Sequence, residues 1–412
     1  MHLIIYNDDK TISKHKISKE LFFDKNLQNC VSYIASSSKE QNALKIFKSH
    51  FSDAKSILFD DSNKILQNEL EKLNIPKFSD IKNETKNETK NLENIFKEHN
   101  FSFLYYTSGS TGFPTAALKT KENISSEIDD LTTLLKSYTI KKVIVTVPFI
   151  HIYGSLFGLF YPLHNNIDIV LKEHFLPNDL LDLIDDYSLV ITTPLYIKAL
   201  NKISSKKDLN KSIFISSTAP LLSEDAKEFK EKFNSNVIQI FGSTETGGIA
   251  YKQSDEELWT PLKSVKISTN ENNELKVNSP YVSNIIYEKE FKQTNYEIQT
   301  FDYVELLNNK FKLIGRSSQI LKIAGKRYST IQIENILEKE EDISKALVLV
   351  NSNNNSLRGE SLDITLETKK EFTAKDIQNI LKNELSNLKF SINLKIVDKI
   401  KTSSTGKKLA IQ

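Results

Sequence analysis

The stretch NVIQIFG, residues 236–242, is a run of apolar and β-branched side chains that ends in glycine. Three other runs share this pattern and end in Pro, Ser or Thr: KKVIVTVP (141–148), SLVITTP (188–194) and KSIFISS (211–217). Runs of this kind, each followed by a loop and a helical segment, are typical of buried parallel strands. We therefore predict an α/β fold between about residues 101 and 250. Because ligands bind at the carboxyl ends of such strands, the loops that follow them are the candidate site.

The last third of the chain has a different pattern. Short runs with turn residues between them predict a small antiparallel sheet over residues 260–315. Beyond Arg316 we expect an α+β unit with a hairpin arm, two helices and three strands, and Thr373 as the N-cap of its second helix. The boundary falls at Gly315–Ser318, which divides the chain into predicted domains of residues 1–315 and 316–412.

Composition excludes several classes of protein. A chain of 412 residues indicates two or three domains. Its 55 basic and 53 acidic side chains nearly cancel, so no overall field attracts nucleic acid or an anionic membrane. Cys30 is the only cysteine, which excludes a disulfide framework and a cysteine-based metal site. The first residues lack the pattern of an export signal, and we expect a cytoplasmic protein.

The segment Val143–Leu163 is uncharged over about the length of a membrane-spanning helix. It also contains His151, two prolines and two glycines. These residues favour a buried strand, a loop and a short apolar helix over a membrane span.

The loop YYTSGSTGFPT, residues 105–115, concentrates Gly, Ser and Thr directly after an apolar run. Backbone N–H groups of such a loop can form a nest for an anion, to which hydroxyl groups add donors. The spacing is neither that of the common nucleoside-triphosphatase loop nor that of a hydrolase nucleophile elbow. Taken alone, a loop of this composition is more often a flexible turn than a phosphate site.

A second loop of this composition, in IQIFGSTETGGIA (238–250), contains Glu245. A hydroxyl group and a carboxylate at a strand end suit a phosphate and its Mg²⁺, whereas the alternative is a helix start that Glu245 merely faces. Further charged candidates follow along the chain: Asp302, Arg316, Lys322, Arg327 and Lys407.

These motifs, in this order, resemble the adenylate-forming superfamily of acyl- and aryl-CoA synthetases, peptide-synthetase adenylation domains and firefly luciferase. The resemblance covers the chain from about residue 100 to its end and rests on eight segments in register. The segments are YYTSGSTGFPT, VPFIHIYG, ITTPLYIKAL, ISSTAPL, FGSTE, TFDYVEL, GRSSQILKIAGKRYSTIQIE and KTSSTGKK. It implies a large adenylate-forming domain, shortened at its N-terminus, and a small mobile C-terminal domain.

The resemblance implies an ATP- and Mg²⁺-dependent acid–thiol ligase. A carboxylic acid, aryl or medium acyl, becomes an acyl-adenylate with release of pyrophosphate, and a pantetheine thiol of CoA then takes the acyl group. The adenylation step brings two anions together, so positioned cations should dominate catalysis. On this resemblance Lys407 bridges the reacting anions, Thr244 donates to the α-phosphate, and Glu245 ligates Mg²⁺.

The same resemblance assigns the nucleotide-binding residues. The outer phosphates fall to the first loop, that is Thr107, Ser108, Gly109, Ser110, Thr111 and Gly112. The adenine side falls to Ser217, Thr218, Ala219, Phe241, Gly242 and Ser243. Asp302 accepts from the ribose hydroxyls, and Arg316 secures the ribose or phosphate side.

The resemblance also links Gly325, His151 and Arg327 to the second step. Rotation of the C-terminal domain about a hinge at Ser318 would exchange the Lys407 loop for a hairpin in which Gly325 lets pantetheine pass. His151 matches a gate residue between the acid pocket and the thiol tunnel, although a lone histidine is more often structural. Arg327, like Lys322 and Lys326, is either a solvated charge or a contact to CoA or carrier-protein phosphates.

The sequence departs from the family pattern at Thr115 and Ser318, where a lysine and a charged residue are usual, and at Phe301, which breaks the usual Thr-Gly-Asp. Two alternative functions stay open. The acceptor is an acyl carrier protein rather than CoA, or the chain is a catalytically inactive nucleotide-binding protein.

Overall fold

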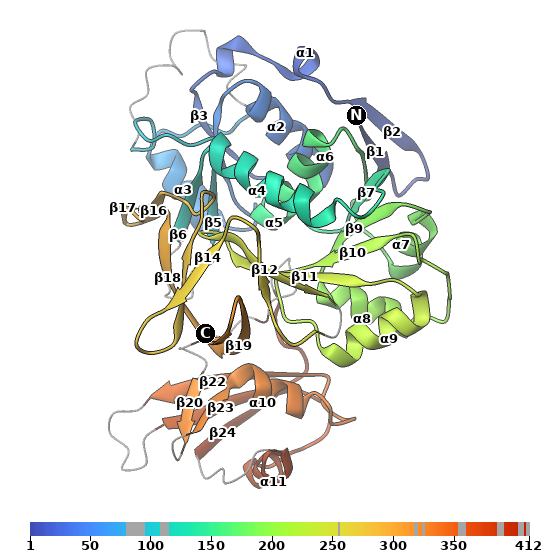
Figure 1. The fold of residues 1–412 in the computed structure, drawn as a ribbon, viewed down its shortest axis with the longest axis vertical. Helices are drawn as coiled ribbons and strands as arrows, with labels where there is room; N and C mark the ends of the chain where they lie inside the picture. Colours follow the sequence, from blue (N-terminus) through green and yellow to red (C-terminus); the bar gives the residue numbers. More distant parts are fainter. Residues whose placement is uncertain are drawn as a thin grey trace. The chain divides into compact units, whose positions relative to one another are not determined.

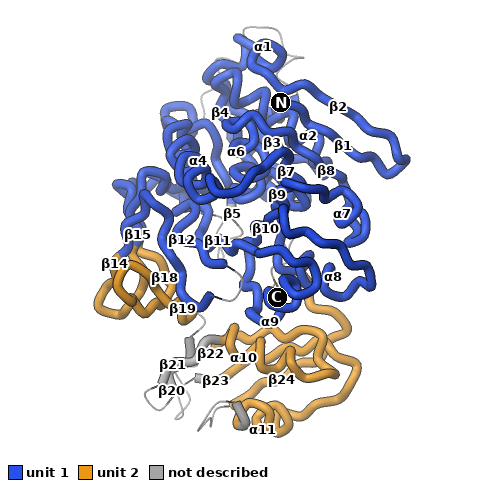
Figure 2. The backbone as a smooth tube through the Cα atoms, turned by 45° about the vertical axis from the view of Figure 1, so that its right-hand side comes forward, with its two compact units in different colours: residues 1–267, 277–298 blue, residues 268–276, 299–412 orange. Residues whose placement is uncertain are grey.

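A computed structural model of the chain describes residues 1–79, 95–107, 115–253, 256–316, 320–323, 326–352, 360–384, 391–402 and 408. The chain forms two compact units (Figure 2). Unit 1 comprises residues 1–267 and 277–298, and unit 2 comprises residues 268–276 and 299–412. The predicted domain boundary at residue 315 stays a prediction.

A nine-stranded sheet dominates unit 1 (Figure 1), in the order β13-β12-β11-β10-β9-β7-β8-β1-β2. The four predicted strands are β7 (Lys142–Val145), β9 (Ser188–Thr192), β10 (Ile213–Ser216) and β11 (Val237–Ser243). They are adjacent and parallel, with every residue of β9 and β10 buried, as the continuous apolar runs predict. The other strands are β1 (His2–Tyr6), β2 (Ile12–Lys16), β8 (Asp168–Leu171), β12 (Gly247–Gln253) and β13 (Thr260–Pro261).

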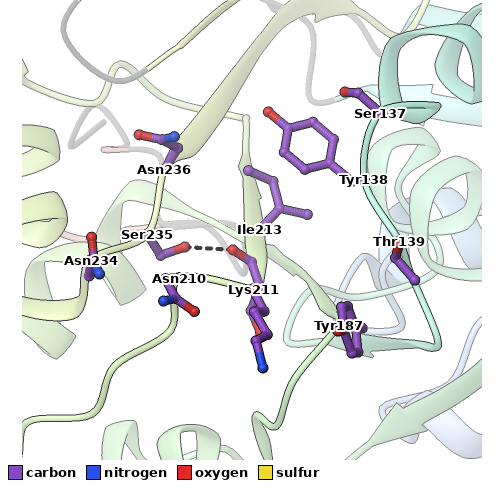
Figure 3. A pocket seen from close by; sticks show the side chains of 11 residues that line it. Ser137, Tyr138, Thr139, Tyr187, Asn210, Lys211, Ile213, Asn234, Ser235 and Asn236 are labelled. Carbon is purple, nitrogen blue, oxygen red and sulfur yellow. Dashed lines mark hydrogen bonds between the residues drawn. The ribbon is translucent and has the colours of Figure 1, made fainter.

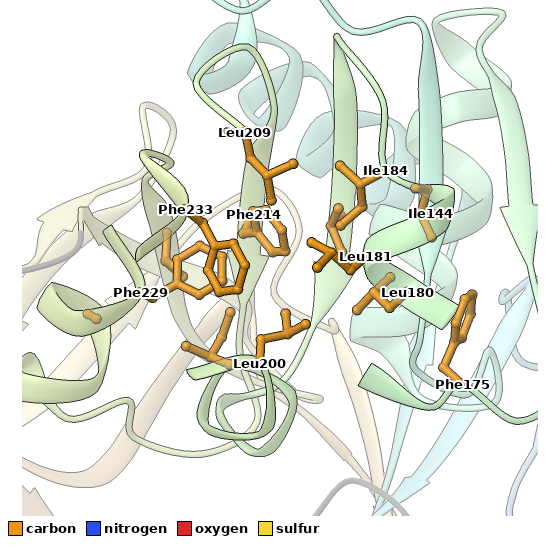
Figure 4. Packing of buried hydrophobic residues seen from close by; sticks show 14 of the residues in the cluster. Ile144, Phe175, Leu180, Leu181, Ile184, Leu200, Leu209, Phe214, Phe229 and Phe233 are labelled. Carbon is orange, nitrogen blue, oxygen red and sulfur yellow. The ribbon is translucent and has the colours of Figure 1, made fainter. Parts of the chain in front are cut away.

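Helices cover this sheet on both faces. Ile144 belongs to a buried cluster with residues of α7 (Pro177–Leu183), α8 (Pro194–Lys202) and α9 (Ser223–Phe233), as Figure 4 shows. Within the cluster, the rings of Phe214 and Phe229 have centroids 4.7 Å apart. The next residue, Val145, must face the other side of the sheet. There its side chain approaches Gly158 so closely that a Cβ on that glycine would lie 2.9 Å from a Val145 methyl.

The segment Val143–Leu163 contains β7, α5 (Ile152–Ser155), a π-helical turn η4 (Leu156–Phe160) and the first residues of α6 (Tyr161–His164). The predicted strand, loop and short apolar helix are therefore confirmed. Among the described residues no helix has both the length and the apolar character needed to cross a bilayer.

A second, six-stranded sheet completes unit 1, in the order β17-β16-β6-β5-β4-β3. Its strands are β3 (Val31–Ile34), β4 (Lys55–Leu58), β5 (Phe103–Thr107), β6 (Thr115–Lys119), β16 (Ile285–Glu288) and β17 (Glu290–Gln293). The accompanying helices are α1 (Lys19–Phe22), η1 (Lys25–Leu27), α2 (Lys39–Phe51), α3 (Lys64–Lys72) and α4 (Lys121–Leu135). Helix α4 begins at a capping box in which Thr120 and Asn123 bond each other's backbone N–H groups.

The antiparallel strands predicted between residues 260 and 315 lie partly in unit 1 and partly in unit 2. A four-stranded sheet has the order β14-β15-β18-β19, and β18 and β19 pair antiparallel as predicted. Its strands are β14 (Lys266–Thr269), β15 (Glu274–Asn278), β18 (Glu297–Leu307) and β19 (Lys310–Arg316), so β14, β15 and β18 begin or end in unit 1.

The remainder of unit 2 matches the predicted α+β unit. It contains the hairpin β20 (Ile320–Ile323) and β21 (Lys326–Ser329), helices α10 (Thr330–Leu337) and α11 (Ala374–Glu384), and strands β22 (Lys345–Ser352), β23 (Glu360–Glu367) and β24 (Ser391–Val397). Thr373 caps α11 as expected, because its hydroxyl accepts from Asp376 N–H while its own N–H donates to the Asp376 carboxylate. Strands β22, β23 and β24 form a three-stranded sheet, and the apolar sides of α10 and α11 pack against it in one buried cluster.

Candidate active site

The carboxyl ends of β10 and β11 bring two of the predicted loops together. These strands pair in parallel register, with Ser216 opposite Gln239, so the residues that follow them leave the same edge of the sheet. The Ser217 hydroxyl donates to the carbonyl of Ile240 at 2.8 Å and ties the first loop to β11. Thr218 has φ +79°, a left-handed conformation that costs a non-glycine residue about 1 kcal/mol or more and is often found in functional loops. Ala219 lies half-buried beside it.

The loop with Glu245 is the turn of a hairpin between β11 and β12, not the start of a helix, so the helix-start alternative is wrong. The side chains of Ser243 and Thr246 link the two ends of this turn by hydrogen bonds. Ser243 N–H donates to the Thr246 hydroxyl at 3.0 Å, and Thr246 N–H donates to the Ser243 hydroxyl at 3.1 Å. The half-buried side chains of Thr244 and Glu245 thus project from a turn of fixed shape.

Phe241 and Gly242 shape the strand end before this turn. The Phe241 ring packs against the Trp259 ring with centroids 5.5 Å apart, and Phe241 directly follows Ile240, whose carbonyl accepts from Ser217. At Gly242 the strand register shifts, and a Cβ there would lie 2.2 Å from the Gly247 carbonyl oxygen. Only glycine therefore permits this close approach of the two hairpin arms.

His151 occupies the N-cap position of α5, and its side chain is half-buried. Burial lowers the pKa of its imidazole, opposed by the charge of Asp60, so the neutral form dominates at neutral pH. The helix that follows is fixed to the sheet edge, because the Tyr153 hydroxyl lies 2.9 Å from the Thr192 carbonyl and 2.8 Å from the Ile215 carbonyl. His151 is thus attached to an element anchored at the ends of β9 and β10.

In unit 2, Asp302 and Arg316 face each other across the β18–β19 hairpin. The Arg316 Nε–H donates to Asp302 Oδ1 at 3.1 Å. Asp302 is 6% exposed, and burial raises the pKa of its carboxyl while Arg316 opposes the shift. The two predicted ribose-side residues therefore form one charged pair.

The other predicted site residues are seen in part or lie outside the described residues. Thr107 ends β5, and Arg327 lies on β21 opposite Lys322, but only their backbones are described. Ser108, Gly109, Ser110, Thr111, Gly112, Gly325 and Lys407 lie outside the described residues. Their roles remain predictions.

Comparison with known proteins settles the family. A family model described as AMP-binding enzyme matches residues 31–283, more than half of the chain. This chain belongs to the AMP-binding enzyme family. The predicted membership of the adenylate-forming superfamily is confirmed.

Individual relatives of this AMP-binding enzyme are distant. A long-chain fatty acid–CoA ligase of Bacillus subtilis is 25% identical over 192 residues, 43% of this chain and 33% of that protein. Alignments with the first three curated relatives span 33% to 61% of their length.

Solved structures match the fold over nearly the whole chain. The o-succinylbenzoate coenzyme A synthetase of Bacillus subtilis, in complex with ATP and magnesium ion, has a TM-score of 0.78 at 16% identity and covers 99% of this chain and 95% of that one. McyG A-PCP, complexed with phenylalanyl-adenylate, has a TM-score of 0.76 at 15% identity, with 99% and 90% covered. At these identities the likeness shows the fold alone, and it confirms the predicted fold class.

The AMP-binding fold also buries a charged cluster that the sequence reasoning did not find. Lys119, Glu127 and Asp130 are 1%, 1% and 4% exposed. Burial lowers the pKa of Lys119 and raises that of Glu127, and each charge partly offsets the shift of the other. One signal was available: Glu127 and Asp130 interrupt the apolar stripe of Ile124, Ile128 and Leu131 on α4, where a solvated charge is not expected.

A pocket of about 200 Å³ lies at the opposite edge of the sheet (Figure 3). Its lining includes Tyr187, Ser212 and Asn236, the residues directly before β9, β10 and β11. The Ser235 hydroxyl donates to the Ser212 carbonyl at 2.8 Å inside it. This pocket is at the amino ends of the strands and does not include any predicted site residue.

Proposed function

We propose that this AMP-binding enzyme is an ATP-dependent acid–thiol ligase that forms an acyl-adenylate and transfers the acyl group to the thiol of CoA. The observation that carries the proposal is that the carboxyl ends of β10 and β11 lie side by side at one edge of the sheet. There Thr218 and Ser217, the Phe241 ring, and the Thr244–Glu245 turn lie on adjacent strand ends. Family membership over residues 31–283 supports the assignment.

The residues of this edge fit a nucleotide and a hard divalent cation. The Glu245 carboxylate is an oxygen ligand of the kind Mg²⁺ prefers. The Thr244 hydroxyl can donate a hydrogen bond to a phosphate oxygen. The hairpin approach at Gly242 and the aromatic Phe241 beside the Ser217 loop offer a flat, closely approached wall for an adenine ring. Mg²⁺, when bound by Glu245, would neutralise phosphate charge.

Adenylation begins when an oxygen of the substrate carboxylate attacks the α-phosphorus of ATP. The bond to the β-phosphate oxygen breaks, and pyrophosphate leaves. In our proposal Lys407 bridges the two approaching anions and Thr244 donates to the α-phosphate. The Thr107–Gly112 loop holds the outer phosphates, and Asp302, oriented by Arg316, accepts from the ribose hydroxyls.

In the second step the thiol sulfur attacks the acyl carbon, the thiol proton is lost, and the bond from that carbon to the AMP oxygen breaks. Neutral His151 would gate access to the acyl carbon, and movement of residues 316–412 about Ser318 would exchange Lys407 for the Gly325 hairpin. A cytoplasmic location also remains a prediction.

Acid-dependent exchange of radiolabelled pyrophosphate into ATP, measured over a panel of aryl and medium acyl acids, tests the first step. We expect exchange with at least one acid and a loss of about 100-fold or more in Lys407→Ala. Lys401→Ala is the matched control, since Lys401 is an exposed lysine of the same tail. Absence of exchange with every acid, together with bound nucleotide, would instead support an inactive nucleotide-binding protein.

The acceptor is tested separately. Adenylated enzyme is incubated with CoA or with a holo-acyl carrier protein, and the products are weighed by mass spectrometry. We expect acyl-CoA. An acylated carrier protein without acyl-CoA would favour the carrier-protein ligase.

A further inference from the structure

Two residues buried beneath the Glu245 turn have no role in the chemistry proposed above. Lys119, the last residue of β6, is 1% exposed, and all five residues of that strand are buried. Its ammonium donates to the carbonyl of Glu245 at 3.1 Å and to the carbonyl of Tyr281 at 2.6 Å. A buried ammonium requires such acceptors, so the position of the Glu245 carbonyl and that of the lysine are mutually fixed.

Glu127 holds the other end of the same turn. It lies on α4, and its Oε1 accepts from the Gly248 N–H at 2.7 Å. Gly247 has φ +69°, and a Cβ on it would lie 2.6 Å from Glu127 Oε2. The carboxylate therefore packs directly against the backbone that leaves the turn.

Together these contacts fix both ends of the short segment that carries Glu245. The Glu245 carbonyl also accepts from Ser283 N–H at 2.9 Å, while Gly248 N–H points to Glu127. The turn's own Ser243–Thr246 bonds give it its shape but do not anchor it to the rest of unit 1. Lys119 and Glu127 are the side chains that anchor it, beside the Ser283 N–H.

We propose that Lys119 and Glu127, the buried clamp, are positioning residues that hold the Glu245 turn where its carboxylate and the Thr244 hydroxyl can bind Mg²⁺ and the α-phosphate. This inference rests on the proposed function. The hydrogen bonds of the clamp go to backbone atoms at the two ends of the turn, so the clamp acts by placing the segment that carries the Glu245 side chain. A displacement of about 1 Å at such a site is enough to cost a large factor in rate or affinity.

Helix α4 supplies a matched control. Asp130 lies one turn after Glu127 and is likewise a buried carboxylate that accepts a backbone N–H, that of Ser264, at 2.7 Å. It also accepts from the hydroxyls of Ser264 and Tyr281, at 2.9 and 3.2 Å. Asp130 therefore shares the burial and helix of Glu127 but bonds no residue of the Glu245 turn.

The test compares Lys119→Met, Glu127→Gln and Asp130→Asn in pyrophosphate exchange. For Lys119→Met we expect the KM for Mg·ATP to rise about tenfold or more, with the KM for the acid changed less than about twofold. Glu127→Gln keeps an oxygen acceptor for Gly248 N–H and should shift the KM for Mg·ATP less. Asp130→Asn should lower the melting temperature but leave this KM within about twofold of the wild type.

The double variant Lys119→Met/Glu127→Gln separates positioning from stability. It also removes the Glu127 carboxylate charge that Lys119→Met leaves without its cation, so its melting temperature should exceed that of Lys119→Met. The proposal expects a raised KM for Mg·ATP to persist in it, because the Glu245 carbonyl still lacks its ammonium donor. A KM that returns to the wild-type value together with the melting temperature would overturn the proposal.

Two measurements do not depend on turnover. Calorimetry gives the dissociation constant of Mg·ATP, and hydrogen–deuterium exchange gives the protection of residues 243–248. Lys119→Met should weaken binding about tenfold and speed exchange in that segment, even if no acid supports pyrophosphate exchange in the wild type. If both quantities stay within about twofold of the wild type, the clamp fails although the ligase function stands.

Discussion

Two lysines, one in each unit, are held in different ways: Lys119 is buried, and Lys408 is half-buried. Lys119 in unit 1 meets two backbone carbonyls, and the carboxylate of Glu127 acts on it only through space. Lys408 in unit 2 contacts Glu334 Oε2 at 2.7 Å, Glu338 Oε1 at 2.5 Å and the Ala346 carbonyl at 2.6 Å. Of the two, only Lys408 has carboxylates within direct reach.

The difference appears in the pKa values. Burial lowers the pKa of Lys119 to about 8, and the charges of Glu127 and Glu245 only partly compensate. Burial would also lower the pKa of Lys408, but the contacts with Glu334 and Glu338 outweigh it and raise the value above that of a free lysine. Backbone carbonyls thus hold the Lys119 ammonium in place, whereas carboxylates in direct contact also raise the pKa of the Lys408 ammonium.

The largest effect on stability should come from Lys408→Met, which leaves the buried Glu334 carboxylate and the half-buried Glu338 carboxylate without their cation. We expect local stability in unit 2 to fall by about 3 kcal/mol. Hydrogen exchange over β22 measures it, because Ala346 N–H and Val348 N–H donate to Glu338 and Glu334. Lys401→Met, at an exposed lysine, is the control, and a similar effect in both variants would contradict the comparison.

Lys119→Met should cost less, about 2 kcal/mol, because the carbonyl of Glu245 keeps its bond from Ser283 N–H. Exchange over β6 reports this loss locally, which avoids assuming that two compact units unfold together. A larger loss than that of Lys408→Met would show that backbone carbonyls hold a cation as firmly as carboxylates do.

The two lysines should also differ in pH dependence. For Lys119, the folded state releases the proton near pH 8 while the unfolded state keeps it to about 10.5, so unfolding takes up a proton between these values. The stability of the wild type relative to Lys119→Met should therefore rise with pH between about 8 and 10.5. For Lys408 the folded pKa is the higher one, so the advantage over Lys408→Met should hold to about pH 10.5 and fall above it.

The smallest effect concerns position 115, where this chain has threonine and the family pattern has lysine. Thr115 is buried on β6, and its hydroxyl lies 3.3 Å from Glu288 Oε1. Thr115→Lys should lower the KM for ATP modestly, about two- to threefold, because Glu288 will compete with phosphate for the new ammonium. Thr115→Lys combined with Glu288→Gln should lower it further, and an unchanged or raised KM in both variants would contradict the prediction.

Local patterns predicted much of the fold and part of the site. Continuous β-branched runs predicted β7, β9, β10 and β11, because a strand buried on both faces has no polar alternation. Thr373 was found as an N-cap because capping depends on residues three apart. The sequence did not predict the ion pair of Asp302 and Arg316, although the contact is local, since a hairpin turn sets their register.

Other features needed tertiary contacts. The Glu245 loop was compatible with a helix start, and the pairing of β11 with β12 made it a hairpin. Lys119 and Glu127 stand in a strand and a helix whose sequences do not reveal which turn they meet. The Gly242 contact with Gly247 likewise exists only once the two arms pair.

The sequence by itself thus determined the α/β class, the order of strands along the chain and the family motifs, because periodicity and short-range hydrogen bonding depend on near neighbours. Only the tertiary structure decided which charges are buried, what holds them, and how the Glu245 turn is anchored. The reason is physical: burial and electrostatic pairing depend on residues far apart in the chain, such as Lys119 with Glu245 and Glu127 with Gly248, which only folding brings together.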